Sequence, residues 1–177
     1  MAAQSPTKYQ SFCVDHWGYD ADPTAKRSLV YPLRFKPAAT MLLVAVGAAL
    51  HLPWLLIAVG VLGLVGTAWP RLSWLDQLWN RLLRHPLSAP ALPDDPDPRR
   101  FACGMADAFV LASGVAFATG WTLTAWVLAG LVLLIAGTVV ATGFCVAAWA
   151  YVKLVPQRSA SAPRPAVGSK PVAANRR

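Results

Sequence analysis

Two thiols and one carboxylate are the side chains of this sequence best suited to chemistry: Cys103, Cys145 and Asp107. Asp107 interrupts an apolar stretch, and an ionised carboxylate at the centre of a membrane span costs roughly 2.5–3.5 kcal/mol. Cys103 precedes Asp107 by one helical turn and shares its helix face, and Cys145 lies near the end of the last apolar stretch. We expect the three to converge at the cytoplasmic mouth of a helical bundle, where they could handle thiols or sulfur species.

These residues have three other interpretations. Cys103 and Cys145 also suit tight packing, because a free cysteine behaves as a small apolar residue, and Asp107 could then hydrogen-bond to a hydroxyl or a backbone group. Alternatively, Asp107 binds a cation or a proton in a small-solute or ion carrier or channel subunit formed by oligomerisation. In the third interpretation, the protein is a structural partner that packs against another membrane protein.

A small residue recurs at every fourth position around Asp107: Gly104, Ala108, Ala112, Ala116 and Gly120. Such a stripe lets a second helix approach closely. Since Asp107 is three residues from Gly104, we expect the carboxylate and the stripe to face the interior of the bundle and not the lipid. Ala112 would then lie at the centre of the packed face.

The basic residues predict the elements that position this site. All 16 Lys and Arg residues lie in three blocks, and the two apolar stretches between the blocks contain none. Basic loops stay on the cytoplasmic side of a membrane, so each stretch crosses an even number of times. The sequence therefore predicts an all-α membrane protein with four transmembrane helices in two hairpins and with cytoplasmic termini. Its segments are a cytoplasmic N-terminal arm (1–37), a first transmembrane hairpin (38–69), a cytoplasmic loop with an amphipathic helix (70–100), a second transmembrane hairpin (101–155) and a disordered basic tail (156–177).

The two hairpins differ in length. Residues 38–69 would form a helix of about 48 Å, longer than a hydrocarbon core of about 30 Å, so we expect the chain to fold back at Pro53. Each half is then close to the lower limit of about 17 residues for a span, and a re-entrant hairpin is the alternative. In the second hairpin we expect a helix that ends at Thr119, followed by one helix from Thr122 to about Leu154 that projects into the cytoplasm.

Between the hairpins, Leu and Trp residues recur at helical spacing from Leu72 to Leu83, and Ser73 is suited to the N-cap position. We expect a helix here. It either lies on the inner membrane surface or extends the second span and covers the bundle.

Composition restricts the function further. With 177 residues, 56% of them apolar, the chain can form one small helical bundle and has no room for a second domain of ordinary size. The formal net charge is +8, but no aromatic residues alternate with the charges of the tail, so we expect binding to anionic lipid and none to nucleic acid. The sequence has no Gly-rich phosphate loop, zinc-protease motif or metal-binding Cys and His spacing. We therefore favour a non-enzymatic role without cofactor or metal.

Several segments of the second hairpin resemble a known family. They are Ala125-Trp-Val-Leu-Ala-Gly130, Gly143-Phe-Cys145-Val and Trp149-Ala-Tyr151. They are similar to the bacterial integral membrane family named domain of unknown function 4395, and the likeness extends from about Leu33 to Tyr151. The resemblance implies a protein of the bacterial inner membrane.

The resemblance also implies a Cys-x-x-Cys pair at the end of the last span, but this chain has Ala148 in place of the second cysteine. Cys145 could still exchange with Cys103 or with a thiol of a thioredoxin-like partner, because a mixed disulfide requires only one attacking thiolate. Besides the lipid bilayer, the other partners that we expect are a second membrane protein or further copies of this chain.

Overall fold

The computed structural model describes residues 14, 17, 19, 23–84, 91–92 and 95–155. Within these residues the chain is helical and forms no strand. The α-helices are α2 (Pro23–Ala49), α3 (Pro53–Ala68), α4 (Trp74–Leu78), α5 (Asp97–Ala118), α6 (Thr122–Thr142) and α7 (Val146–Leu154). A 3-10 turn, η1 (Pro70–Leu72), precedes α4, and a π-helical turn, η2 (Trp79–Leu83), follows it. The predicted disordered tail lies outside the described residues.

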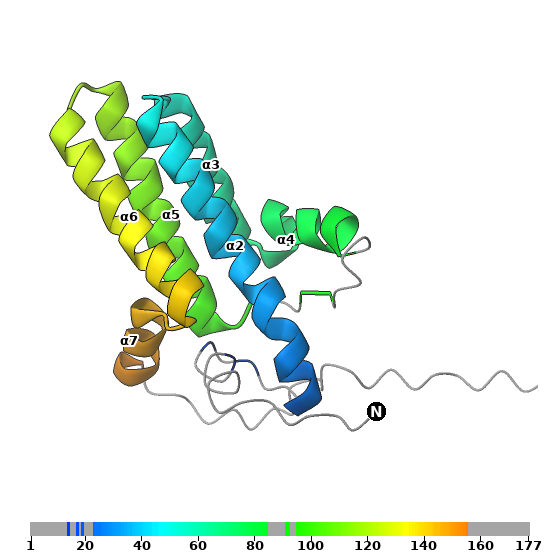
Figure 1. Ribbon diagram of the computed structural model, residues 1–177. Coiled ribbons are helices and arrows are strands. Elements are labelled where there is room, and N and C mark those ends of the chain that lie inside the picture. Colours follow the sequence, from blue (N-terminus) through cyan, green and yellow to red (C-terminus); the bar gives the residue numbers. More distant parts are fainter. Residues whose placement is uncertain are drawn as a thin grey trace, which may run out of the picture.

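The four long helices α2, α3, α5 and α6 lie side by side, as Figure 1 shows. Each packs against two of the others, because α3 contacts α2 and α5 while α6 contacts α2 and α5. The turns α2–α3 and α5–α6 lie together at one end (Figure 1), whereas α7 packs against α5 at the other end. The fold-back that the sequence predicts at Pro53 is present, since Pro53 is the first residue of α3.

Two of these helices are long and apolar enough to cross a membrane: α5 with 22 residues and α6 with 21. The helix α3 is strongly apolar but has 16 residues, slightly fewer than the roughly 17 that a span requires. The all-helical prediction is therefore confirmed for the described residues, and the assignment of four spans stays a prediction.

The first helix begins at Pro23, inside the segment for which the sequence predicts an arm. The three prolines of α2 do not end the helix. Pro23 occupies the first helical position, where a backbone N–H would have no acceptor within the helix, so its absence costs no hydrogen bond. Pro32 and Pro37 both lie within α2.

The prediction of one continuous helix from Thr122 to about Leu154 is wrong. The helix α6 ends at Thr142 because Gly143 adopts a left-handed conformation with a φ of 70°, which glycine reaches at little cost. The Gly143 N–H still donates to the Val139 carbonyl at 2.8 Å. The chain then runs extended through Cys145 and starts the separate helix α7.

The predicted amphipathic helix is present in part, as η1, α4 and η2 in succession. Ser73 does occupy the N-cap position of α4, but its side chain makes no capping hydrogen bond. Leu75 and Trp79 are buried, while Leu78 and Leu82 are exposed. The segment therefore covers the bundle with one face and leaves an apolar edge uncovered.

The small-residue stripe of α5 is not its packed face. Ala108 and Ala112 are exposed, so the expectation that the stripe faces the interior is wrong at these positions. The buried residues of α5 include Asp107, Val110 and Gly114. The close approach of α3 to α5 depends mainly on glycines of α3. Gly60 lies against Leu111 and Gly63 lies against Asp107. Because these two positions of α3 carry no side chain, α5 can have larger residues opposite them.

We expect Gly60→Ala to destabilise the protein. A Cβ atom at Gly60 would lie 2.7 Å from the Leu111 backbone nitrogen, so α3 and α5 would have to separate, at a cost of about 1–3 kcal/mol. The matched control is Gly130→Ala in α6, where nothing lies within 4 Å of the added Cβ. Thermal unfolding in detergent should show a lower midpoint for Gly60→Ala and no decrease for Gly130→Ala, and equal midpoints would contradict the close approach.

Candidate functional site

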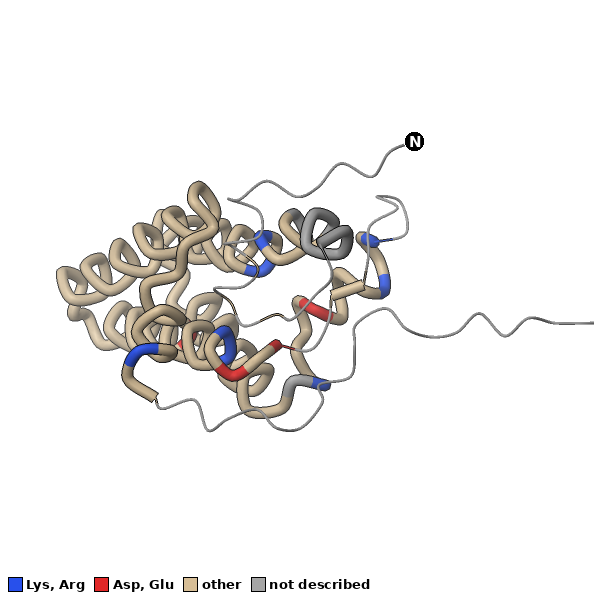
Figure 2. The backbone as a smooth tube through the Cα atoms, turned by 90° about the horizontal axis from the view of Figure 1, so that it is seen from below, with Lys and Arg blue, Asp and Glu red and all other residues tan. Residues whose placement is uncertain are grey.

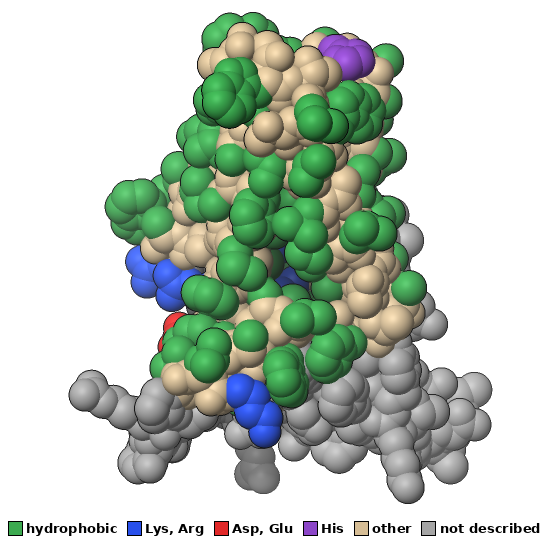
Figure 3. Space-filling model, turned by 90° about the vertical axis from the view of Figure 1, so that its left-hand side faces the viewer, with side chains coloured by type: hydrophobic (Ala, Val, Ile, Leu, Met, Phe, Trp, Pro, Cys, Tyr) green, Lys and Arg blue, Asp and Glu red, His purple; other side chains and the backbone are tan. Residues whose placement is uncertain are grey.

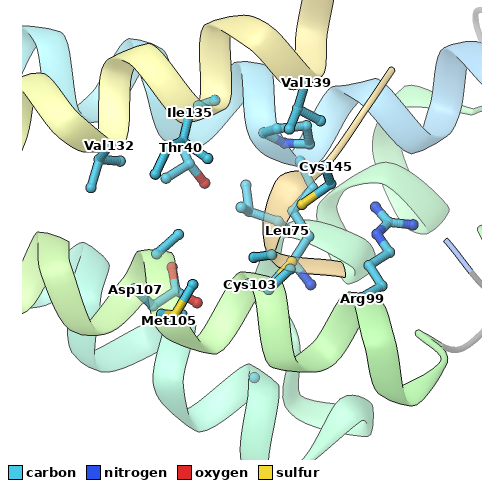
Figure 4. Close-up of a pocket in the computed structure, with 18 of the residues that line it drawn as sticks. Thr40, Leu75, Arg99, Cys103, Met105, Asp107, Val132, Ile135, Val139 and Cys145 are labelled. Atoms are coloured by element: carbon cyan, nitrogen blue, oxygen red, sulfur yellow. The ribbon is translucent and has the colours of Figure 1, made fainter. Parts of the chain in front are cut away.

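A cavity of about 100 Å³ lies among α2, α3, α5 and α6. Its wall is mostly apolar and includes residues of α4 and α7. The polar and thiol-bearing side chains that line it are Lys36, Thr40, Ser73, Arg99, Cys103, Asp107 and Cys145. Figure 4 shows this cavity from the side. All three residues that the sequence singles out, Cys103, Asp107 and Cys145, therefore line one cavity.

The two thiols reach the cavity from different elements. Cys103 is on α5, whereas Cys145 is in the short connection between α6 and α7. Figure 4 shows both at the same end of the cavity, near Arg99. The break at Gly143 explains this position, because it lets the chain after α6 turn so that α7 packs against α5.

Asp107 lies one turn further along α5. It is only 7% exposed, and its carboxylate faces Gly63 of α3. The Thr67 hydroxyl lies near that carboxylate as its side-chain hydrogen-bond donor, and Thr67 Oγ1 is buried without another hydrogen-bond partner. The carboxylate thus lies in an apolar wall beside one buried hydroxyl.

A buried charge cluster closes one end of the cavity. Lys36 Nζ donates to Asp95 Oδ2 at 2.7 Å and lies 3.4 Å from Asp76 Oδ2. Arg99 Nη1 lies 3.2 Å from Asp95 Oδ1 and donates to the Tyr19 hydroxyl at 2.6 Å. The Tyr19 hydroxyl in turn donates to Asp95 Oδ1 at 2.9 Å. Figure 2 views the molecule from this end.

Arg99 is held by further contacts. Its guanidinium lies 4.9 Å from the centre of the Trp17 ring, a cation–π arrangement, and Nη2 donates to the Leu33 carbonyl at 3.2 Å. The adjacent Arg100 caps the C-terminus of α3, since its Nη2 donates to the Thr67 carbonyl at 2.9 Å. The start of α5 is thereby joined to α2 and α3 through two successive arginines.

Charges around Asp95 control its ionisation. Burial favours the neutral acid, but Arg99 and Lys36, together with the hydrogen bonds from Lys36 and Tyr19, hold the pKa of Asp95 below its ordinary value. Asp95 is therefore ionised in the folded protein at neutral pH. This cluster could not be seen in the sequence pattern, because Lys36 lies in the segment predicted as an N-terminal arm and Asp95 and Arg99 lie in the segment predicted as a cytoplasmic loop. The feature of the sequence that could have indicated part of the cluster is the four-residue spacing from Asp95 to Arg99, which suits an ion pair along a helix.

Comparison with known proteins identifies a family. The family model described as domain of unknown function (DUF4395) matches residues 30–155, which is well over half of the chain. The chain belongs to this family. No curated protein and no solved structure matches it.

The family match confirms the resemblance expected from the sequence, and its range includes both thiols, Asp107 and the ion pairs of Lys36, Asp95 and Arg99. In the described residues of this DUF4395 protein, no three His, Cys, Asp or Glu side chains are grouped so that they could hold a metal ion.

We expect Asp95→Asn to destabilise the protein by about 3–5 kcal/mol at neutral pH, because it leaves Lys36 and Arg99 buried without their shared carboxylate. The control is Asp97→Asn, since the Asp97 side chain is 78% exposed. Unfolding in detergent measures both, and equal small losses would show that the cluster does not stabilise the fold.

The same cluster predicts a pH dependence. Since the pKa of Asp95 is lowered on folding, its stabilisation is present above the unfolded pKa of about 3.9 and is lost as pH falls through the folded-state pKa. The wild-type protein should therefore lose more stability on acidification than Asp95→Asn.

Proposed function

We propose that this DUF4395 protein is a multi-pass protein of the bacterial inner membrane, a four-helix bundle in two hairpins with cytoplasmic termini. In α5 and α6 only 28% and 22% of the most apolar window is buried within the chain, whereas the core helix of a soluble protein would be mostly buried. Figure 3 shows hydrophobic side chains along the whole height of one face, with Lys and Arg only toward the end that carries α4 and α7. Lipid is the environment suited to such a surface.

The short helix α3 is compatible with a span. A bilayer thins locally around a hydrophobic segment that is slightly too short, at a cost of fractions of a kcal/mol per Å. The exposed Leu78 and Leu82 beside the exposed Arg81 suit the inner interface, where apolar side chains enter the headgroup region and basic ones bind anionic lipid.

Reporter fusions test this topology. A periplasmic reporter should be inactive when fused after Leu87 and active when fused after Gly120, because the basic block 71–100 stays cytoplasmic and the α5–α6 turn lies outside. Activity after Leu87 would mean that the first hairpin crosses only once, and the four-span proposal would be abandoned.

Within the membrane, the protein is proposed to act as an accessory protein that exchanges thiols at the cytoplasmic mouth of the cavity. The observation that carries this proposal is that Cys103 and Cys145, from separate elements, line the same cavity. Lys36 and Asp107 both lie within electrostatic range of Cys103. The ammonium group of Lys36 stabilises a thiolate there, whereas the carboxylate of Asp107 disfavours it.

The exchange is a two-electron reaction with a disulfide of a thioredoxin-like partner. One cysteine thiolate attacks the partner disulfide, which forms a mixed disulfide and releases one partner thiol. The second cysteine then attacks the mixed disulfide, which forms the Cys103–Cys145 bond and releases the other partner thiol. The two protein thiols are oxidised, and the partner disulfide takes up the two electrons and two protons. The reverse sequence reduces the protein again.

Mild oxidation of a Cys13→Ser variant in membranes tests the proposal. Mass spectrometry should detect an internal Cys103–Cys145 disulfide, and Asp107→Asn should speed its formation because the carboxylate no longer opposes the Cys103 thiolate. Cys145→Ser is the control and should give no internal link. If no link forms and a membrane-permeant maleimide labels the two thiols independently, the cysteines are packing residues.

A further inference from the structure

The thiol proposal does not explain why Asp107 is buried in an apolar wall. The residue is more than nine-tenths buried and lines the cavity, with Thr67 as the hydroxyl that acts on its carboxylate. Burying a carboxylate is costly, and an ionisable group inside a membrane protein usually marks an ion pathway, a proton relay or a counter-ion for a ligand. The structure therefore has a buried acceptor and an open volume in front of it.

The opposite wall supplies a second oxygen. Thr40 of α2 also lines the cavity, and Figure 4 shows the Thr40 hydroxyl and the Asp107 carboxylate on opposite sides of the open volume. A hydrogen bond from the buried Thr67 hydroxyl would orient the carboxylate toward the cavity.

The charge and size of the cavity select the ligand. The volume of about 100 Å³ is several times the roughly 10–15 Å³ that a cavity needs to hold one water molecule, so a small ion with one or two waters fits in it. Asp107 contributes one negative charge, while Lys36, which is on α2 with Thr40, is already paired with Asp95 and Asp76. A divalent ion would leave an excess positive charge beside Lys36, in a medium of low dielectric constant. Oxygen ligands without a His or Cys group favour a hard cation.

We propose that the cavity is a binding site for a monovalent cation, with the Asp107 carboxylate and the Thr40 hydroxyl as its protein ligands and Thr67 as the residue that positions the carboxylate. Water molecules complete the coordination of the ion. The site does not require either thiol, so its occupancy can be tested separately from thiol exchange.

The test uses the full-length protein in detergent, with Na⁺ as the probe and choline chloride to keep ionic strength constant. Because an ion that binds only the folded state stabilises it by mass action, the unfolding temperature should rise with Na⁺ and then saturate. Binding of ²²Na⁺ should saturate at one ion per chain. Repeating the titration with K⁺ determines whether the site accepts a larger ion of the same charge.

Variants assign the ligands. Asp107→Asn should abolish both the stabilisation by Na⁺ and the binding of ²²Na⁺, whereas the exposed Asp97→Asn, with the same loss of charge on the same helix, should keep them. If Asp107→Asn does not fold, Thr40→Val provides a second test: it removes the hydroxyl and keeps the shape, and we expect the half-saturating Na⁺ concentration to rise about tenfold, a loss typical of one hydrogen-bonding ligand. Thr40→Ser should retain wild-type affinity.

Two outcomes would overturn the proposal. In the first, neither Na⁺ nor K⁺ raises the unfolding temperature in a saturable way, whereas acidification raises it in the wild type and not in Asp107→Asn. Asp107 would then bind only a proton. The other is an Na⁺ effect that persists in Asp107→Asn. A Cys103→Ser variant separates this site from the thiol proposal, because it should bind Na⁺ normally even though it cannot form the internal disulfide.

Discussion

The contact of Lys36 and Arg99 with one buried carboxylate, Asp95, is the interaction on which the arrangement of this molecule depends. It joins α2 to the residue pair at the start of α5, and Tyr19 is hydrogen-bonded to the same group. Two cations and one anion leave a net charge that Asp76 helps to balance. In a buried setting such a cluster is stable only when every member keeps its partner, so it determines how the two hairpins meet at this end.

The cavity exists because that end is held by charges while the middle of the bundle is held by glycines. Gly60 and Gly63 bring α3 close to α5 at Leu111 and Asp107, and the Ser113 hydroxyl donates to the Ala125 carbonyl at 2.9 Å, which joins α5 to α6. The cavity extends from these glycines to the charged end and is lined by both thiols and by Asp107. Polar groups are thus placed around a small volume in an otherwise apolar interior.

Thiol exchange and cation binding would use different groups that line this cavity. Cys103 and Cys145 lie near Arg99, at the end that the proposed topology places on the cytoplasmic side, and Asp107 lies one turn further along α5. The two sites remain electrostatically connected, since Asp107 and Lys36 both act on Cys103. A cation bound at Asp107 would reduce the effect of the carboxylate on the Cys103 thiolate. The occupancy of one site would in this way influence the reactivity of the other.

The periodicity and charge pattern of the chain were sufficient to predict that it is helical, that it folds back at Pro53 and that Asp107 is buried, because these depend on local geometry and on keeping a carboxylate away from an apolar surface. Local patterns could not predict which face of α5 packs, since Ala108 and Ala112 resemble an interface as much as the glycines of α3 do. Nor could they show that Gly143 would end α6 and redirect Cys145. The charge cluster was also hidden, because Lys36 and Asp95 are 59 residues apart. Their pairing is decided only when the long helices pack and remove both from water.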